Sequence, residues 1–152
     1  MKIISKSLDE TKQFTQTFLA DLKPACAGRP KTSKLKATVL LLEGDLGSGK
    51  TTFTQFLAQE LGVKNYITSP TFVLMKRYKI NYLDFKQLIH IDAYRLNSGQ
   101  DLLNLGWSEL VSNPANLIVV EWPEKVADLF TGEEVKINFK FVDEKTREMS
   151  YT

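Results

Sequence analysis

The fold of this chain is decided by the stretch Thr38-Val39-Leu40-Leu41-Leu42-Glu43-Gly44-Asp45-Leu46-Gly47-Ser48-Gly49-Lys50-Thr51-Thr52. Its first part is a short, continuously apolar run, which is typical of a strand buried on both faces of a parallel sheet. A turn with three glycines follows, and residues 50–61 then carry an apolar helical face that ends before Gly62. The order of strand, glycine-rich turn and helix predicts an open α/β sheet.

Residues 44–51 match the pattern G-x-x-x-x-G-K-[ST] at every position, between the predicted strand and the predicted helix. Glycines let the backbone turn so that successive N–H groups face phosphate oxygens, and the helix N-terminus adds positive potential. We therefore expect a site for Mg-ATP in which Lys50 neutralises the β- and γ-phosphates and the Thr51 hydroxyl binds Mg²⁺. The expected nucleotide contacts are Gly44, Asp45, Leu46, Gly47, Ser48, Gly49, Lys50, Thr51 and Thr52. We interpret Asp45 as a cap for backbone amides rather than as a catalytic group.

An acidic residue, Glu121, directly follows a second apolar run, Leu117-Ile118-Val119-Val120. Ligands of open α/β sheets bind at the carboxyl ends of the strands, so this carboxylate is expected beside the phosphates. Glu121 could hold Mg²⁺, directly or through water, or orient the attacking water. A strand-end glutamate that faces solvent is the alternative. The next residue, Trp122, either stacks on the adenine or packs in the core.

Three polar residues, His90, Asp92 and Tyr94, alternate with apolar ones. The period of two in a strand puts these polar groups on one face. Asp92 is therefore a second candidate for holding Mg²⁺, and Arg95 is a candidate ligand of a phosphate or a carboxylate. His90 is equally well explained as a hydrogen-bonded structural histidine.

The turn Ser69-Pro70-Thr71-Phe72 offers a hydroxyl that could sense the γ-phosphate, as switch residues of nucleotide hydrolases do. The alternative is an ordinary turn before a strand that begins at Phe72. The expected catalytic residues are Lys50, Thr71, Asp92 and Glu121.

The rest of the chain predicts a single domain over residues 1–152, with three α/β/α layers, a mostly parallel central sheet and an antiparallel C-terminal hairpin. Ser7-Leu8-Asp9-Glu10 has the form of a capping box and begins a helix that ends before Pro24. The remaining expected elements are a basic surface loop at 24–36, strands at 72–80 and 88–93, short helices within 102–110, and a hairpin from residue 135 onwards.

Composition excludes several classes of protein. A chain with 43% hydrophobic and 25% charged residues is globular rather than disordered. A net charge of +2 is too small to predict nucleic-acid binding by bulk electrostatics, and we expect neither DNA nor a membrane as a partner. The single cysteine, Cys26, favours a reducing compartment, and no run has the length of a signal peptide or a membrane span. We expect a cytoplasmic protein.

Four motifs follow one another in an order that resembles one family. They are residues 42–52, Ser69-Pro70-Thr71-Phe72, His90-Ile91-Asp92-Ala93-Tyr94-Arg95-Leu96 and Glu121-Trp122-Pro123-Glu124. Over about residues 36 to 142 the chain resembles TsaE, also called YjeE. The resemblance implies an ATPase that acts with TsaB and TsaD to form N6-threonylcarbamoyladenosine at position 37 of tRNAs that read ANN codons.

The resemblance also implies roles for individual residues. Lys50 and Thr51 match the phosphate and Mg²⁺ ligands, Thr71 the switch threonine, Asp92 the acid near the metal, Glu121 the acid of the Walker B-like strand and Trp122 a tryptophan close to the nucleotide. In the family the carbamoyl transfer belongs to TsaD, so tRNA is expected to be contacted only through the complex. Two features depart from the family: the basic segment 24–36, and Ser48 where alanine is expected.

Three other functions remain to be weighed against an ATPase from the sequence. A small phosphotransferase could use the same phosphate loop, but such enzymes clamp phosphates with several arginines, and this chain has four arginines and no arginine-rich lid segment. A GTPase is less favoured, because the chain has no N-K-x-D segment to read guanine. A nucleotide-gated adaptor with little turnover is the alternative without catalysis.

Overall fold

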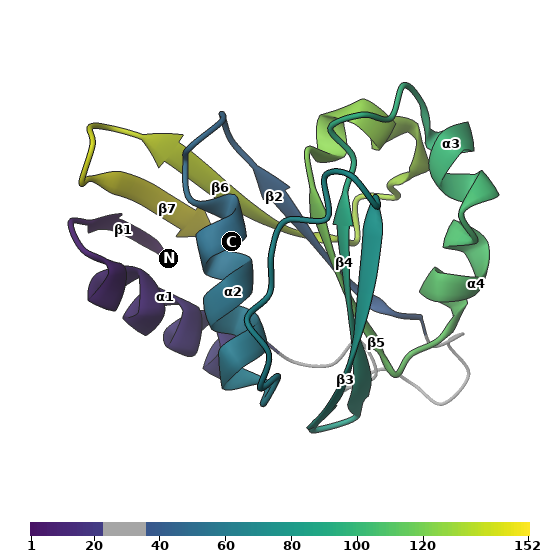
Figure 1. The fold of residues 1–152 in the computed structure, drawn as a ribbon, viewed down its shortest axis with the longest axis horizontal. Coiled ribbons are helices and arrows are strands. Elements are labelled where there is room, and N and C mark those ends of the chain that lie inside the picture. Colours follow the sequence, from purple (N-terminus) through teal and green to yellow (C-terminus); the bar gives the residue numbers. More distant parts are fainter. Residues whose placement is uncertain (23–35) are drawn as a thin grey trace.

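The computed structural model describes residues 1–22 and 36–152 as one seven-stranded sheet with helices on both faces (Figure 1). The strands are β1 (Lys2–Ser5), β2 (Thr38–Glu43), β3 (Met75–Tyr82), β4 (Phe85–Asp92), β5 (Asn116–Glu121), β6 (Val135–Phe141) and β7 (Arg147–Tyr151). The helices are α1 (Leu8–Asp21), α2 (Lys50–Glu60), α3 (Gly99–Asn104), α4 (Trp107–Ser112) and the 3-10 helix η1 (Pro123–Leu129). Except for Lys36, the basic segment expected at 24–36 lies outside the described residues.

The order of the strands in the sheet is β1-β7-β6-β2-β5-β4-β3. Strands β6, β2, β5 and β4 run parallel at its centre. Antiparallel pairs complete both edges: β3 pairs with β4, and β7 pairs with β6 and β1. The expected α/β fold, with a parallel centre and an antiparallel C-terminal hairpin, is therefore confirmed. Because β2 is the middle strand, the glycine turn that follows it opens at the centre of the carboxyl edge of the sheet.

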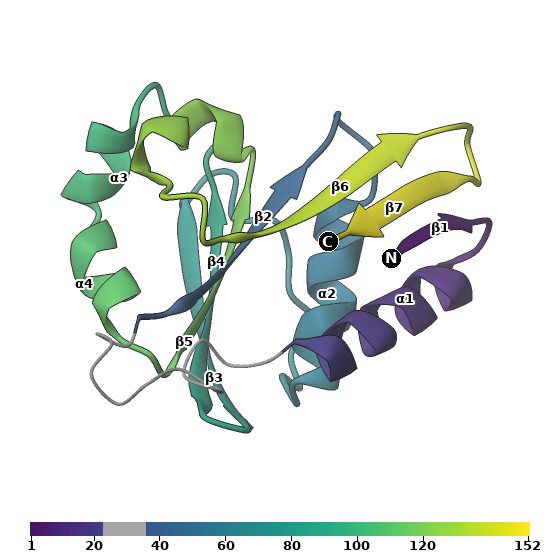
Figure 2. The ribbon, with the colours of Figure 1, turned by 180° about the vertical axis from the view of Figure 1, so that it is seen from behind.

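The side chains of β2 alternate between two apolar layers. Leu40 and Leu42 pack in the layer covered by α1 and α2, whereas Val39 and Leu41 pack in the layer covered by α3, α4 and η1. Seen from behind, α1 and α2 again lie on one side of the sheet and α3 and α4 on the other (Figure 2). The continuously apolar run is explained because both faces of this strand are buried.

The helix predicted after Ser7 is α1, and its N-terminal cap differs in one contact from a capping box. The Ser7 hydroxyl accepts from the Glu10 amide at 3.2 Å, as predicted. The Glu10 carboxylate accepts from the amide of Lys6, one residue before the cap, and not from that of Ser7. The two side chains still satisfy two backbone donors at the start of the helix.

The strand predicted from Phe72 begins only at Met75. The amides of Val73 and Leu74 both donate to the carbonyl of Pro70, and Leu74 has a positive φ of 65°. These bonds make residues 70–74 a tight turn, and Phe72 is 84% exposed. The apolar character of this segment therefore reflects an exposed turn rather than a buried strand. The connection from β3 to β4 is also shorter than predicted, because it contains only residues 83–84.

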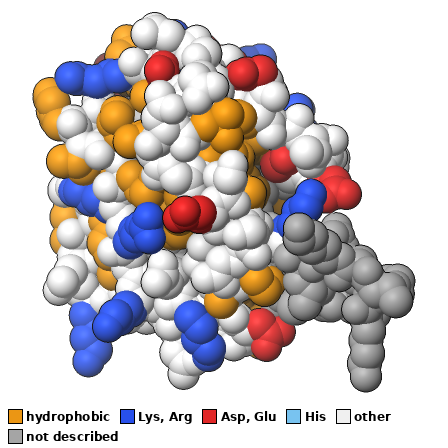
Figure 3. Space-filling model, turned by 90° about the vertical axis from the view of Figure 1, so that its right-hand side faces the viewer, with side chains coloured by type: hydrophobic (Ala, Val, Ile, Leu, Met, Phe, Trp, Pro, Cys, Tyr) orange, Lys and Arg blue, Asp and Glu red, His pale blue; other side chains and the backbone are white. Residues whose placement is uncertain are grey.

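The side of the molecule that carries α3 and α4 shows Lys and Arg side chains interspersed with Asp and Glu (Figure 3). Charges of both signs on this face agree with the small net charge of +2. Within residues 1–22 and 36–152, no helix combines the length and the apolar character that a bilayer crossing needs.

Tyr151 joins the last strand to the first helix and is expected to titrate at high pH. Its hydroxyl donates to the Asp21 carboxylate at 2.6 Å, and its ring packs edge-on against Phe14 and Phe18. Burial, together with the bond to Asp21, raises the pKa of Tyr151 to about 12 from its ordinary value of 10.0. Stability from this raised pKa is present below pH 10 and is lost as the pH rises through 12.

We therefore expect the difference in tyrosinate absorbance between the unchanged protein and Tyr151→Phe, followed against pH, to show one group that titrates near pH 12. A midpoint at pH 10 would contradict the contact with Asp21.

Candidate functional site

The phosphate loop requires its glycines for two different reasons. Gly44, Gly47 and Gly49 have φ values of 147°, 72° and 105°, a region that favours glycine. In addition, a Cβ on Gly44 would lie 2.2 Å from the Phe139 carbonyl oxygen on the neighbouring strand β6. The first glycine is therefore also required by close approach of two backbones.

The Lys50 side chain folds back over this loop. Its ammonium donates to the carbonyls of Gly44 and of Asp45, the latter at 2.8 Å, and lies 4.0 Å from the centroid of the Trp122 ring. Lys50 is only 5% exposed, and burial lowers its pKa, while nearby carboxylates, led by Glu121, oppose that shift. The cation is thus held at the loop by groups that incoming phosphates can replace.

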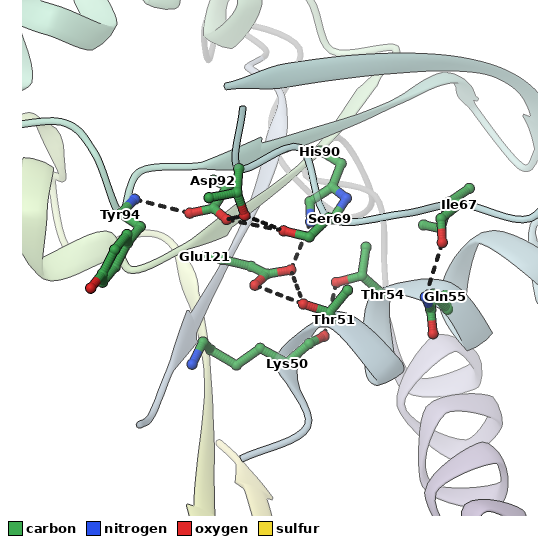
Figure 4. Close-up of polar contacts among 11 residues, drawn as sticks. Lys50, Thr51, Thr54, Gln55, Ile67, Ser69, His90, Asp92, Tyr94 and Glu121 are labelled. Carbon is green, nitrogen blue, oxygen red and sulfur yellow. Dashed lines mark hydrogen bonds and ion pairs between the residues drawn. The ribbon is translucent and has the colours of Figure 1, made fainter. Parts of the chain in front are cut away.

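Glu121 ends strand β5 and is 2% exposed, so the interpretation as a solvent-facing glutamate is wrong. Its carboxylate accepts from the Thr51 hydroxyl at 3.1 and 3.2 Å (Figure 4). On its other side it lies 2.8 Å from Nε2 of His90, which is fully buried on β4. The structure therefore brings Thr51, Glu121 and His90 into one hydrogen-bonded row.

A second carboxylate, Asp92, lies beside Glu121 because the two residues are register partners on the parallel strands β4 and β5. Asp92 Oδ2 accepts from the hydroxyls of Thr71 at 2.7 Å and Ser69 at 3.0 Å. Its Oδ1 accepts from the backbone amide of Tyr94 at 2.9 Å. The predicted switch threonine is thus bound directly to the predicted metal-site acid. Figure 4 shows Ser69 and Tyr94 beside the same carboxylate.

Most of these groups line one cavity of about 830 Å³, although fully buried His90 does not. Of the expected site residues, its lining includes Leu46, Gly47, Ser48, Gly49, Lys50, Thr51, Thr52, Thr71, Asp92, Glu121 and Trp122. Gly44 and Asp45 do not line it, and their carbonyls instead bind Lys50. Arg95 does not line it either: its guanidinium lies 4.5 Å from the ring centroid of exposed Phe72. The structure thus keeps Arg95 away from the phosphate loop.

The ring of Trp122 lies at the cavity and over the Lys50 side chain. Its ring contacts the Lys50 ammonium and lies 5.1 Å from the ring of Tyr94, between centroids. A positive φ of 59° at Trp122 turns the chain from β5 into η1 and directs the ring over the loop. This position is suited to holding the lysine near the phosphates.

The residues present fit a Mg²⁺ ion bound together with a nucleotide. Mg²⁺ prefers hydroxyl, carboxylate and water oxygens and needs few protein ligands when phosphates supply the rest. The Thr51 hydroxyl is hydrogen-bonded to the Glu121 carboxylate, both residues line the cavity, and Asp92 lines it from the adjacent strand. In the part of the chain that the structure describes, no group of three or more His, Cys, Asp or Glu side chains could hold a metal ion without such phosphates.

Comparison with known proteins gives one consistent result. A family model described as "Threonylcarbamoyl adenosine biosynthesis protein TsaE" matches residues 5–149. The chain belongs to the TsaE family. This family is involved in tRNA threonylcarbamoyladenosine biosynthesis.

Members of the TsaE family match over most of their length. The protein of Rickettsia bellii is 34% identical over 145 residues, covering 95% of this chain and 89% of that protein. The protein of Bacillus subtilis is 33% identical over 144 residues, covering 95% and 80%. The crystal structure of Bacillus subtilis YdiB superposes with a TM-score of 0.73 at 29% identity, covering 99% of this chain and 83% of that one.

One wall of the cavity is built by residues that lie outside the four sequence motifs quoted above. This wall consists of Ser5, Lys6, Ser7, Leu8 and Thr11 from the N-terminus and Glu144, Lys145, Arg147 and Met149 from the C-terminal hairpin. Strand β1 pairs with β7, and this pairing brings the two chain ends to the phosphate loop. No signal in the local sequence could have identified these residues, because their place depends on long-range pairing.

Ser48, where the TsaE resemblance implies alanine, provides a test of the loop. Its hydroxyl is fully buried and has no hydrogen-bond partner among the residues of known placement. We expect the free energy of unfolding of Ser48→Ala, measured in urea, to be unchanged or up to about 1 kcal/mol higher than that of the unchanged protein. The reason is that the substitution removes an unsatisfied buried hydroxyl. A loss of more than about 1 kcal/mol would instead indicate a hydrogen bond made by this hydroxyl.

Proposed function

We propose that this chain is the Mg²⁺-dependent ATPase of N6-threonylcarbamoyladenosine formation at position 37 of tRNAs that read ANN codons, acting with TsaB and TsaD. The observation that supports the proposal is that Lys50, Thr51 and Glu121 line the same cavity in a chain of the TsaE family. We further propose one P-loop ATPase domain over residues 1–152, working in the cytoplasm and contacting tRNA only through the complex.

ATP binding is assigned to the loop and to the first turn of α2. The helix N-terminus and the loop amides would bind phosphate oxygens, and the Lys50 ammonium would move from the carbonyls of Gly44 and Asp45 to the β- and γ-phosphates. Thr51 and, directly or through water, Glu121 and Asp92 would hold Mg²⁺, which would neutralise charge on the phosphates.

Glu121 and Asp92 would have separate roles in hydrolysis. Glu121 would orient the attacking water, and buried His90 would keep its carboxylate in place through the 2.8 Å contact. Thr71 would leave Asp92 Oδ2 and bind the γ-phosphate, so the turn at residues 70–74 would respond to the nucleotide. Turnover would thereby reset a complex rather than modify tRNA directly.

We favour an ATPase over a phosphotransferase because Arg147 is the single arginine, among those with described positions, that lines the cavity. A phosphate-clamping lid would need several such side chains. The adaptor function predicts instead that ATP binding suffices for the pathway. The two functions differ in whether a variant that binds ATP without hydrolysing it supports modification.

The experiment is reconstitution of tRNA modification with purified TsaB and TsaD of the same organism, with this chain either present or omitted. ATP hydrolysis and threonylcarbamoyladenosine are measured in the same reaction. We expect both to require the chain. Equal modification without it would contradict the proposal, even if the chain binds ATP.

A further inference from the structure

Arg147, at the start of strand β7, lies against the phosphate loop although it is 100 residues away from it in sequence. Its Nε donates to the carbonyl oxygen of Gly47 at 2.9 Å. A Cβ on Gly49 would meet Arg147 Cγ at 3.9 Å, so the side chain runs alongside the glycine turn. Arg147 also lines the cavity.

The Arg147 guanidinium is itself held in place by the C-terminal hairpin. Its Nη1 donates to the carbonyls of Asp143 and Thr146, and its Cζ lies 4.5 Å from the ring centroid of Phe141. The Asp143 carboxylate accepts from the Lys145 and Thr146 amides and stiffens this turn. The contact with Gly47 is therefore made by a group with little freedom to move.

This contact fixes one peptide plane of the phosphate loop. The Gly47 carbonyl is held by Arg147, and the next amide, that of Ser48, donates to the Asp45 carbonyl at 3.2 Å. A trans peptide points its carbonyl and its N–H in opposite directions, so the plane is restrained on both sides. Because Gly47 has wide conformational freedom and a φ of 72°, the loop depends on such restraints to keep its amides directed at phosphates.

We propose that Arg147 is a positioning residue of the phosphate loop. Through the Gly47 carbonyl it holds the loop in the phosphate-binding conformation, and it thereby makes affinity for the diphosphate part of the nucleotide depend on the C-terminal hairpin. The proposal rests on the proposed nucleotide site.

The test compares Arg147→Ala, Arg147→Lys and the control Arg77→Ala, which removes the same charge from an exposed position on β3 that does not line the cavity. Dissociation constants of Mg-ADP and of inorganic pyrophosphate are measured by competition against a fluorescent ADP. We expect Arg147→Ala to weaken both ligands by about tenfold, because one charged hydrogen bond to the loop is lost. Arg147→Lys should be nearly as weak, because an ammonium cannot reproduce the planar fork. Arg77→Ala should bind as the unchanged protein does.

Three outcomes would overturn the proposal. In the first, Arg147→Ala binds both ligands with dissociation constants within twofold of those of the unchanged protein, even if its thermal stability falls. Arg147 would then stabilise only the hairpin. Weakened ADP with unchanged pyrophosphate would place its effect on the base or the sugar. Full rescue by lysine would show that charge alone matters. If the unchanged protein binds neither ligand, the nucleotide site itself is wrong, and this result is distinct from the other three.

Discussion

Lys50→Ala is expected to abolish measurable ATP hydrolysis and tRNA modification and to weaken Mg-ATP by roughly 100-fold. The physical reason is the loss of the Lys50 ammonium, which lies over the phosphate loop on a side chain that is 5% exposed, where its charge is weakly screened by water. Binding is measured by titration with labelled ATP, and modification in the reconstituted reaction.

The folded state should tolerate Lys50→Ala well. The ammonium is desolvated by burial, which offsets part of what its two hydrogen bonds contribute to stability. Both carbonyls that it leaves belong to residues with exposed surface, since Asp45 is exposed and Gly44 is partly exposed. We expect the free energy of unfolding to change by no more than about 1 kcal/mol. Lys79→Ala, which removes a lysine from an exposed position on β3 outside the cavity, is the matched control. Unchanged ATP affinity in Lys50→Ala would contradict the phosphate site.

Glu121→Gln is expected to lower the rate of hydrolysis by about 10²–10³-fold and to leave ATP affinity within roughly threefold. Glutamine keeps the shape and one acceptor for the Thr51 hydroxyl, so the loop and helix α2 stay in place. The negative charge that would orient water is lost. Single-turnover hydrolysis and equilibrium binding separate the two effects.

Glu121→Ala, unlike Glu121→Gln, should also lower the stability of the folded protein, because it removes the partner of His90. It leaves Nε2 of a fully buried histidine without its 2.8 Å partner and is expected to cost about 1–3 kcal/mol of stability. Glu109→Gln, at an exposed position on α4, is the control. If Glu121→Gln supports full tRNA modification without hydrolysis, the adaptor function replaces the ATPase.

Much of the site could be predicted from the sequence because its residues belong to elements that are adjacent in the chain. A buried strand, a glycine turn and a helix are adjacent in the chain, so residues 38–61 define their own geometry. Asp92 and Glu121 were predictable because each follows an apolar strand and parallel strands end at one edge. The structure then shows the carboxylates as register partners, which fixes their separation.

Other predictions were wrong where the same local sequence pattern is compatible with two different structures. The apolar residues from Phe72 suit a strand, but the bonds from Val73 and Leu74 to Pro70 make a turn instead. Arg95 follows the strand that carries Asp92, yet it packs on Phe72 outside the cavity. The direction of a side chain beyond the strand end depends on backbone turns that periodicity does not encode.

The sequence by itself therefore determined the class of fold, the phosphate loop and the two acids, since each depends on neighbours in the chain. Only the tertiary structure decided which residues complete the cavity. Arg147 reaches Gly47 because β7 returns beside β6 and places its first residue over a loop 100 positions earlier. His90 contacts Glu121 because β4 and β5 pair in parallel and bury its ring beside that carboxylate. Such contacts arise from strand pairing across long separations, and the local sequence carries no record of the partner.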